Sequence, residues 1–456
     1  MQFIRRAFLA SIPVALVLLN VTCREPEAFP DESYDNRLSG GSNTVFDNTS
    51  KAFGNPFPHL NVYDLAVHTT GDRQFEAIFV TAPAAVNSGL GPLYNNVSCV
   101  SCHHNDGIGV PTIGGAESSL LLRISLPGSD EHGGPLAVSG YGTQLQVKAT
   151  FGKEPECLAS ISYMYQTFSF ADGETYELRT PSYTLSGLYA PISGGYLLSP
   201  RLAPPVFGLG LLEAVPENEI VSNAAGSGGI TGKANYVWDP VTQKMALGRF
   251  GWKANTASIL AQVAGAYNQD MGVTNSVFPL ENSAGQAQFD SLKDDPELPD
   301  YLLNAVKFYV QTLAVPARRN LSDPTTQRGE GLFGQAKCSS CHLSTLTTGV
   351  NVAFPSISNQ RIHPYTDLLL HDMGAGLADG RPDFGASGSE WRTAPLWGVG
   401  LFETVNYPAY YLHDGRARTL TEAIMWHGGQ ADQSRTFFQQ LSKNDRNALI
   451  AFLKSL

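Results

Sequence analysis

Apolar and polar residues alternate with a period of two in several short stretches of the first half of the chain. These stretches cover residues 120–126, 144–149 and 176–185, and Gly or Pro bounds them. Alternation of this kind is typical of strands that have one buried face. The pattern therefore predicts a β-rich insertion at about residues 115–200.

Apolar residues recur every three to four positions elsewhere, which predicts helices. One expected helix covers residues 300–313, another begins at residue 329, and a third covers 442–456 with one apolar face for packing. Two further helices are expected within residues 251–264 and 414–427, each opening with a Ser or Thr cap.

An internal repeat divides the chain. Residues 201–213 resemble residues 392–403, because both contain an Arg-x-Ala-Pro string followed by closely spaced glycines. Repetition at this distance predicts a duplicated unit. We place the boundary after residue 315, which gives predicted units of 53–315 and 316–456.

The N-terminus resembles an export signal. Arg5 and Arg6 precede an apolar run at residues 7–19 that is too short to span a bilayer comfortably. We expect residues 1–22 to be a signal peptide and the mature protein to lie in the periplasm or cell envelope. Residues 23–52 are rich in Pro, Gly, Ser, Asn and Asp, and predict a flexible tether.

Cys23 stands where a lipoprotein signal places its acylated cysteine. Asn20, however, occupies a position that usually carries an aliphatic residue. Lipid anchoring at Cys23 and simple cleavage nearby both stay open, and an anchor of this kind is the one membrane contact that we expect.

Composition limits the partners. Charged residues make up 16% of the 456-residue chain, with 45 Gly and 28 Pro, a composition that suggests long ordered loops wrapped around something. The net charge of −11 argues against a nucleic-acid partner, since phosphate binding needs a basic face. It suits a basic redox protein as electron donor or target.

Four of the six cysteines fall in two Cys-x-x-Cys-His strings. In such a string two thiols add to the two vinyl groups of a haem, and the adjoining histidine reaches the iron from below. The sequence therefore predicts two covalently bound c-type haems with His103 and His342 as iron ligands. The cysteines concerned are Cys99, Cys102, Cys338 and Cys341. Whether the remaining pair, Cys23 and Cys157, forms a disulfide stays open.

These two motifs, with residues 392–397, 411–417 and 419–424, resemble the di-haem oxidoreductase family of peroxidase-type enzymes. This family is related to the bacterial di-haem cytochrome c peroxidases and to the enzyme that matures methylamine dehydrogenase. The resemblance runs from about residue 50 to the end. It implies a mainly α fold of two cytochrome c-like haem domains, with the β-rich insertion in the first.

The resemblance implies an electron-relay role for the C-terminal haem. In the peroxidases a methionine is its sixth ligand, and His427 stands at that place here. A second imidazole would lower the potential of this haem. Met425 and Met373 stay open as rival ligands.

The resemblance also makes the N-terminal haem the site of peroxide chemistry. The best matches to the family's catalytic groups are Trp252 between the haems, and Gln262 and Asp270 on the distal side. Cleavage of peroxide needs a base that moves a proton and a donor that polarises the bond, roles that suit Asp270 and Gln262. Gln146 and Glu156 form a rival pair with similar spacing.

Other implications concern ions and partners. The family binds calcium through backbone oxygens at the places of Thr393 and Pro395, while His104, His371 and His413 are expected to contact propionates or backbone. We expect hydrogen peroxide or another small oxidant as substrate. A non-catalytic electron-transfer cytochrome and an accessory redox role in iron acquisition stay open as alternatives.

Overall fold

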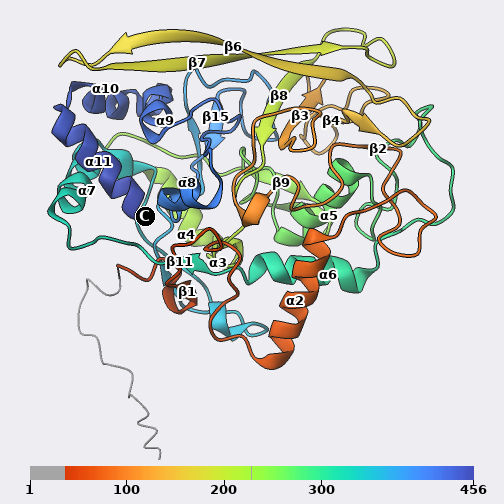
Figure 1. The fold of residues 1–456 in the computed structure, drawn as a ribbon, viewed down its shortest axis with the longest axis horizontal. Coiled ribbons are helices and arrows are strands. Elements are labelled where there is room, and N and C mark those ends of the chain that lie inside the picture. The colour runs from red at the N-terminus through yellow and green to blue at the C-terminus, as the bar shows by residue number, and fades with distance from the viewer. Residues whose placement is uncertain (1–35, 227) are drawn as a thin grey trace, which may run out of the picture.

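The fold combines helices with many small sheets. A computed structural model of the chain describes residues 36–226 and 228–456, so the predicted signal peptide and Cys23 lie outside the described residues. Only 28% of the chain is helical and 19% is strand (Figure 1). The expectation of a mainly α fold is therefore wrong, and a layout of two cytochrome c-like domains is not confirmed. Short strand pairs and Gly- and Pro-rich loops occupy much of the chain instead.

Two helix pairs form the helical framework, one in each half. In the first half α2 (Val62–Glu76) packs against α6 (Asp300–Gln311), and in the second half α7 (Pro324–Gln335) packs against α11 (Lys443–Ser455). Both α2 and α7 precede a Cys-x-x-Cys-His string. The pairs lie well apart in Figure 1, as expected for two copies of one unit.

The same close contact recurs in both pairs. A Cβ added at Gly71 of α2 would lie 2.1 Å from the carbonyl oxygen of Ala305 on α6. A Cβ added at Gly329 of α7 would lie 1.9 Å from that of Ala448 on α11. Each glycine therefore lets two helix backbones approach closely, so the duplication extends to the packing of the helices.

Further helices lie in the chain between the two members of each pair. Two of them, α5 and α9, begin as expected with a hydroxyl cap: Ser258 accepts a hydrogen bond from the Ala261 amide, and Thr419 from the Glu422 amide. The remaining helices are α3 (Leu209–Glu213), α4 (Glu217–Ser222), α5 (Ile259–Met271), α8 (Phe402–Val405), α9 (Leu420–Trp426) and α10 (Asp432–Gln440).

Strands occur in the three stretches where the alternating pattern predicted them, and further strands occur in other parts of the chain. Three of them form a sheet in the order β4 (Gln144–Leu145), β3 (Leu120–Ser125) and β8 (Leu197–Leu202). The other described strands form pairs: β1 (Thr44–Val45) with β11 (Val315–Pro316), β2 (Leu93–Tyr94) with β5 (Lys148–Ala149), β6 (Leu158–Ser169) with β7 (Thr175–Ser186), β9 (Tyr236–Asp239) with β10 (Lys244–Leu247), β12 (Leu346–Thr347) with β13 (Arg361–Ile362), and β14 (Leu370–Asp372) with β15 (Glu390–Arg392).

The longest pair, β6 and β7, is an antiparallel ribbon that lies along one side of the molecule in Figure 1. It belongs to the first half in sequence but contacts α9 of the second half. The Arg179 side chain fixes this contact, since its Nη2 and Nε donate to the carbonyl oxygens of Gly415 and Arg416 at 2.8 Å. The β-rich insertion therefore joins the halves.

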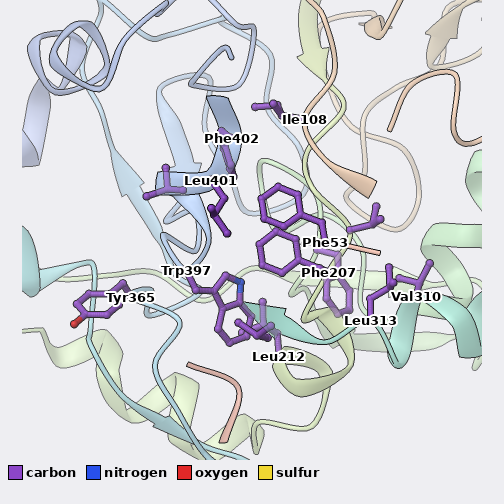
Figure 2. Close-up of a cluster of buried hydrophobic side chains, with 14 of the residues drawn as sticks. Phe53, Ile108, Phe207, Leu212, Val310, Leu313, Tyr365, Trp397, Leu401 and Phe402 are labelled. Atoms are coloured by element: carbon purple, nitrogen blue, oxygen red, sulfur yellow. The ribbon is translucent and has the colours of Figure 1, made fainter. Parts of the chain in front are cut away.

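The apolar core also joins them. One cluster of buried side chains contains residues from Ala52 to Leu456. Figure 2 shows its centre, where Phe53 stacks on Phe207 with 4.3 Å between ring centroids and meets Phe402 edge-on at 6.0 Å. Phe207 comes from the first repeat segment, and Trp397 and Phe402 from the second.

The described part of the predicted tether packs against this body. Asn43 and Ala52 are fully buried, and β1 pairs with β11. Packed structure therefore begins before residue 52. Among the described residues, every helix is too short or too polar to cross a membrane.

Candidate active site

One large cavity lies between the two halves, and both Cys-x-x-Cys-His strings line it. It encloses about 3100 Å³ of space free of protein atoms, including its openings to solvent. Its walls are mostly apolar, with side chains such as Phe75, Val263, Phe333 and Leu453. The structure thus brings together six residues that the motifs singled out: Cys99, Cys102, His103, Cys338, Cys341 and His342.

The two motif histidines are held in the same way. His103 Nδ1 lies 2.7 Å from the carbonyl oxygen of Pro204, and His342 Nδ1 lies 2.9 Å from that of Tyr365. Because a carbonyl oxygen only accepts, each Nδ1 must carry the proton, which leaves the Nε2 lone pair free for a metal. Burial lowers the pKa of both imidazoles to about 4, so both are neutral at pH 7.

His427 lines the same cavity and repeats this arrangement. It follows the last residue of α9, and its Nδ1 lies 2.8 Å from the Ala423 carbonyl oxygen. Burial lowers its pKa, and the charge of His427 in turn contributes to lowering the pKa of His342, as expected for rings in the same cavity. Of the rival ligands, Met373 also lines the cavity, whereas Met425 lies in the wall of an adjoining pocket.

In the first half, one face of α5 lines the cavity. Gln262 and Asp270 both lie on this face, together with Ala266 between them. Gln144 Nε2 donates to Asp270 Oδ1 at 2.7 Å. Burial raises the pKa of Asp270, although the positive charge of Arg123 and the Gln144 hydrogen bond oppose this effect. A carboxylate in such surroundings takes up a proton more readily than one in water.

Trp252 lies where the two repeat segments meet. Its indole Nε1 donates to the Leu202 carbonyl oxygen at 2.7 Å, and its own carbonyl accepts from the Arg392 amide at 2.8 Å. Its side chain lines the cavity. These contacts place Trp252 at the junction of the two halves, and its expected place between the haems stays a prediction.

The rival pair lies elsewhere. Glu156 accepts hydrogen bonds from the Gln146 amide at 2.6 Å and from Gln286 Nε2 at 2.7 Å, and burial raises its pKa to about 8. Neither Gln146 nor Glu156 lines the cavity. Cys157 is also fully buried outside the cavity.

His371 is bound on both ring nitrogens. Its Nε2 lies 2.8 Å from Asp367 Oδ2, and its Nδ1 lies 3.4 Å from Cys341 Sγ. Burial acts to lower the pKa of His371, but the Asp367 and Cys341 hydrogen bonds outweigh it and raise the pKa to about 10. His104 does not line the cavity.

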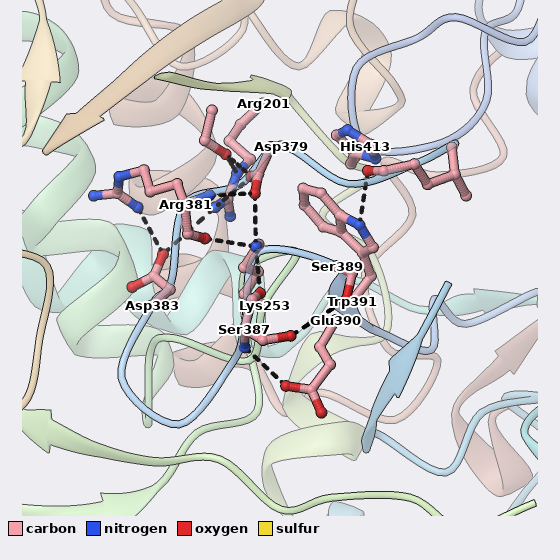
Figure 3. Close-up of polar contacts among 12 residues, drawn as sticks. Arg201, Lys253, Asp379, Arg381, Asp383, Ser387, Ser389, Glu390, Trp391 and His413 are labelled. Atoms are coloured by element: carbon pink, nitrogen blue, oxygen red, sulfur yellow. Dashed lines mark hydrogen bonds and ion pairs between the residues drawn. The ribbon is translucent and has the colours of Figure 1, made fainter. Parts of the chain in front are cut away.

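His413 stacks on Trp391 with 3.7 Å between ring centroids, and Figure 3 shows this pair beside a buried charged cluster. The cluster centres on Lys253, whose Nζ donates to Asp379 Oδ1 at 2.9 Å and lies 4.5 Å from the Trp391 ring centroid. Burial lowers the pKa of His413 to about 4. The cluster fixes the cavity wall at Trp391.

The carbonyl oxygen of Thr393, one of the expected calcium ligands, does not fit a cation. The Thr393 carbonyl oxygen accepts hydrogen bonds from Thr366 Oγ1 at 2.6 Å and from Arg392 Nη1 at 3.1 Å. A guanidinium at this distance would repel a divalent ion. We therefore propose no role for calcium in the chemistry of this site.

Residues 34–456 match the family described as "Di-haem oxidoreductase, putative peroxidase". The chain belongs to the di-haem oxidoreductase family. Membership implies haem cofactors, and the resemblance on which the sequence analysis drew is thereby confirmed.

Solved structures add little to this di-haem oxidoreductase assignment. Hydrazine synthase from Kuenenia stuttgartiensis shares 14% identity, covering 99% of this chain and 100% of that chain, with a TM-score of 0.35. A MauG-like protein associated with microbial copper homeostasis shares 16% identity, covering 55% of this chain and 89% of that chain, with a TM-score of 0.27. At such scores neither likeness carries an argument. Among curated proteins, none matches the chain significantly.

The cavity fits the haems that this di-haem oxidoreductase family implies. Within residues 36–226 and 228–456, no group of three or more His, Cys, Asp or Glu side chains could hold a metal ion. A porphyrin supplies four ligands itself, so a haem site needs only an axial histidine and apolar walls. Each half of the cavity provides both.

Sequence reasoning missed several residues in the cavity wall. Met271, next to Asp270, and the arginines Arg123 and Arg392 all line the cavity. Arg123 follows the strand alternation, because it and Leu121 face the cavity while Leu122 is buried on the other side. A charged residue within an apolar strand was the signal that could have found it.

Proposed function

We propose that this chain is an exported c-type cytochrome oxidoreductase of the peroxidase type. One observation carries the proposal. Both Cys-x-x-Cys-His strings line a single apolar cavity, and each motif histidine is fixed as a neutral imidazole with Nε2 free. A pair of haems in one cavity can exchange electrons, as a peroxidase with separate reaction and relay sites needs.

Covalent attachment follows from the thiols. Cys99 and Cys102 would hold the haem of the first half, and Cys338 and Cys341 that of the second. When bound, the haems would supply the redox-active iron for peroxide reduction and electron relay. His427 would be the sixth ligand in the second half, since its Nε2 is free and it lies near His342.

The chain's own groups would manage the protons. Asp270, ionised above its raised pKa, would take a proton from peroxide and return it to the departing oxygen. Gln262, on the same face of α5, would donate a hydrogen bond to the oxygen on which negative charge develops. Trp252 would lie in the electron path between the halves, because it contacts both repeat segments.

The partners follow from charge and chemistry. Hydrogen peroxide or another small oxidant would react in the first half, while a redox protein would give electrons to the second or receive them from it. The net charge of −11 would favour a basic partner. The N-terminal signal supports a periplasmic or cell-envelope location, with a lipid at Cys23 if that residue is acylated.

A second function, electron transfer without peroxide chemistry, is favoured by Met271. This residue lines the cavity in the first half, and a thioether can ligate haem iron. If Met271 filled the distal position, no site would be left for peroxide.

Haem stoichiometry tests the proposal for covalent attachment. The wild-type chain, made together with a c-type haem attachment system, should carry two haems by intact mass and pyridine haemochrome absorbance. The double variant Cys99→Ser/Cys102→Ser should carry one, and so should Cys338→Ser/Cys341→Ser. Cys157→Ala, which changes a buried thiol outside the cavity, should retain both. A wild-type chain without covalent haem would overturn the proposal.

A further inference from the structure

The cavity wall carries a charge opposite to that of the chain. The chain has 41 Asp and Glu against 30 Lys and Arg. Among the described residues, however, its cavity is lined by a single carboxylate, that of Asp270, against five Lys and Arg side chains: Arg123, Arg201, Lys337, Arg392 and Arg435. Such an excess in an acidic protein indicates an occupant that brings negative charge.

Three of the five cations are satisfied without an occupant. Arg201 Nη2 lies 3.5 Å from Asp383 and 3.7 Å from Asp379. Arg435 forms an ion pair with Asp432. Lys337 is exposed, so water solvates its charge. These three residues therefore require nothing from the cavity.

Arg392 is different. Its Nε donates to the Gly251 carbonyl oxygen at 2.9 Å and its Nη1 to that of Thr393 at 3.1 Å, and both acceptors are neutral. No ion pair joins it to a carboxylate within the described chain. Burial lowers its pKa to about 10, although the Asp367 carboxylate opposes this effect from beyond ion-pair distance.

Arg123 shares these properties in the first half. It points from β3 into the cavity, and its Nη1 donates to the amide oxygen of Gln269. Among the residues that the structure describes, it has no salt bridge either. Burial lowers its pKa, although the carboxylates of Asp270 and Asp383 oppose this effect from a distance.

Filling the cavity with a porphyrin would make both charges costly. An apolar macrocycle displaces water, and a buried charge without a partner is strongly unfavourable. A haem also carries two propionate carboxylates, and a guanidinium binds a carboxylate with two parallel hydrogen bonds.

We infer that Arg392 and Arg123 each hold a haem propionate, Arg392 at the junction of the two halves beside Trp252, and Arg123 in the first half. The inference rests on the proposed function, since it needs haems in the cavity. Arg392 and Arg123 are then positioning residues that orient the macrocycles and tune their potentials.

Resonance Raman spectra and redox titrations test this inference in the haem-loaded protein. The propionate bending bands report hydrogen bonds to these carboxylates. They should shift in Arg392→Gln and in Arg123→Gln. Each variant should also lower the reduction potential of the haem whose propionate the arginine holds, because a cation near iron favours the reduced form. We expect a roughly tenfold change in the ratio of oxidised to reduced haem, about 59 mV for one electron.

Arg319 provides the matched control. It is also a partly buried arginine, and its hydrogen bonds go to main-chain oxygens, those of Ala317 at 3.2 Å, Lys454 at 2.9 Å and Leu456 at 2.5 Å. It does not line the cavity, so Arg319→Gln should leave the Raman bands and potentials unchanged. If a glutamine variant fails to fold, Arg392→Lys and Arg123→Lys replace it in the test. These variants keep the positive charge but lose the planar guanidinium that binds a carboxylate with two hydrogen bonds, so the propionate bands should still shift.

The outcomes separate the two claims. A wild-type protein with two haems whose propionate bands do not change in the Arg392 and Arg123 variants overturns the inference alone. A wild-type protein without haem overturns the proposed function together with it.

Discussion

Three imidazoles in the cavity are prepared as metal ligands by the same hydrogen bond. In His103, His342 and His427 the Nδ1 proton is held by a backbone carbonyl oxygen. The bond fixes the tautomer and the ring orientation before a metal arrives, which limits the ordering cost of binding. Two of these residues belong to the haem motifs, and the third, His427, directly follows α9 and lines the same cavity.

Replacing the third imidazole should change one potential. In His427→Met a thioether would take the place of the imidazole, and the potential of the C-terminal haem should rise by on the order of 0.1 V, because thioether ligation favours reduced iron. Spectroelectrochemical titration measures this shift. His132→Met is the control, because His132 stacks on Trp238 outside the cavity. An unchanged potential in His427→Met would assign the sixth position to another residue, such as Met373.

Glu156 should make stability depend on pH. Burial raises its pKa from 4.5 to about 8 in the folded state, so between these values the folded chain holds a proton that the unfolded chain releases. Wild-type stability should therefore fall as pH rises through this window. In Glu156→Gln the stability should not fall over this pH window, because the new side chain does not ionise. The Gln286 Oε1 atom is buried without a partner among the described residues, so the Gln286 amide can turn and accept a hydrogen bond from the amide of the new glutamine.

Denaturant unfolding followed by circular dichroism at pH 5 and pH 9 measures this difference. Relative to wild type, the variant should be more stable at pH 9 than at pH 5 by about 1 kcal/mol or more. A difference between the proteins that does not change with pH would show that Glu156 does not hold the extra proton.

The sequence predicted the metal-binding histidines better than the groups that orient them. The motif spacing was enough to find His103 and His342, since the chemistry of haem attachment dictates it. The carbonyl of Pro204, which orients His103, lies 101 residues away in the chain. Arg392 belongs to a quoted motif, yet only the structure shows that it lacks a counter-ion.

At the scale of elements, the two helix pairs share one crossing. Gly71 and Gly329 stand at the contact, while Tyr309 and Phe452 fill corresponding places on the partner helices. Each pair also positions an aromatic ring beside its motif histidine, with centroid distances of 6.1 Å from Phe75 to His103 and 6.3 Å from Phe333 to His342. Each helix crossing therefore helps to position the motif histidine of its own half.

Two glycines of α7 should respond oppositely to alanine. In Gly329→Ala the new methyl group would lie 1.9 Å from the Ala448 carbonyl oxygen and would force the helices apart, so we expect a loss of about 3 kcal/mol. In Gly331→Ala nothing lies within 4 Å of the new atom, and the variant should gain about 0.5–1 kcal/mol from helix propensity. Urea unfolding of both variants measures the difference, and equal effects would contradict the packing described for the crossing.

Periodicity predicted several of the longer elements, but neither α2, the longest described helix with 15 residues, nor β6, a strand of 12 residues. The helix expected at residues 442–456 is α11, capped by Ser442, and the strands expected near residues 120 and 176 are β3 and β7. Strand pairs of two residues, such as β1 with β11, are too short to show a period. Their pairing depends on contacts between distant segments, which a local pattern does not contain.

At the scale of the whole molecule, the two halves share one core and one cavity. Phe53 packs against both Phe207 and Phe402, and the β6–β7 ribbon reaches across to α9. The sequence correctly predicted a repeat, but the resemblance overestimated helix. Long loops and small sheets form much of the structure around the cavity, because a chain with 45 Gly and 28 Pro favours turns over long helices.

We propose that one haem of this di-haem oxidoreductase is open to peroxide while the other is closed. Electron paramagnetic resonance of the purified ferric protein, before and after addition of peroxide, tests it most directly. We predict a high-spin signal from the first half that changes with peroxide, beside a low-spin signal from the second half. In Asp270→Asn the high-spin signal should persist but respond more slowly, by roughly 10²–10⁴-fold. Two low-spin haems that ignore peroxide, in both the oxidised and the half-reduced protein, would contradict the account and leave an electron carrier.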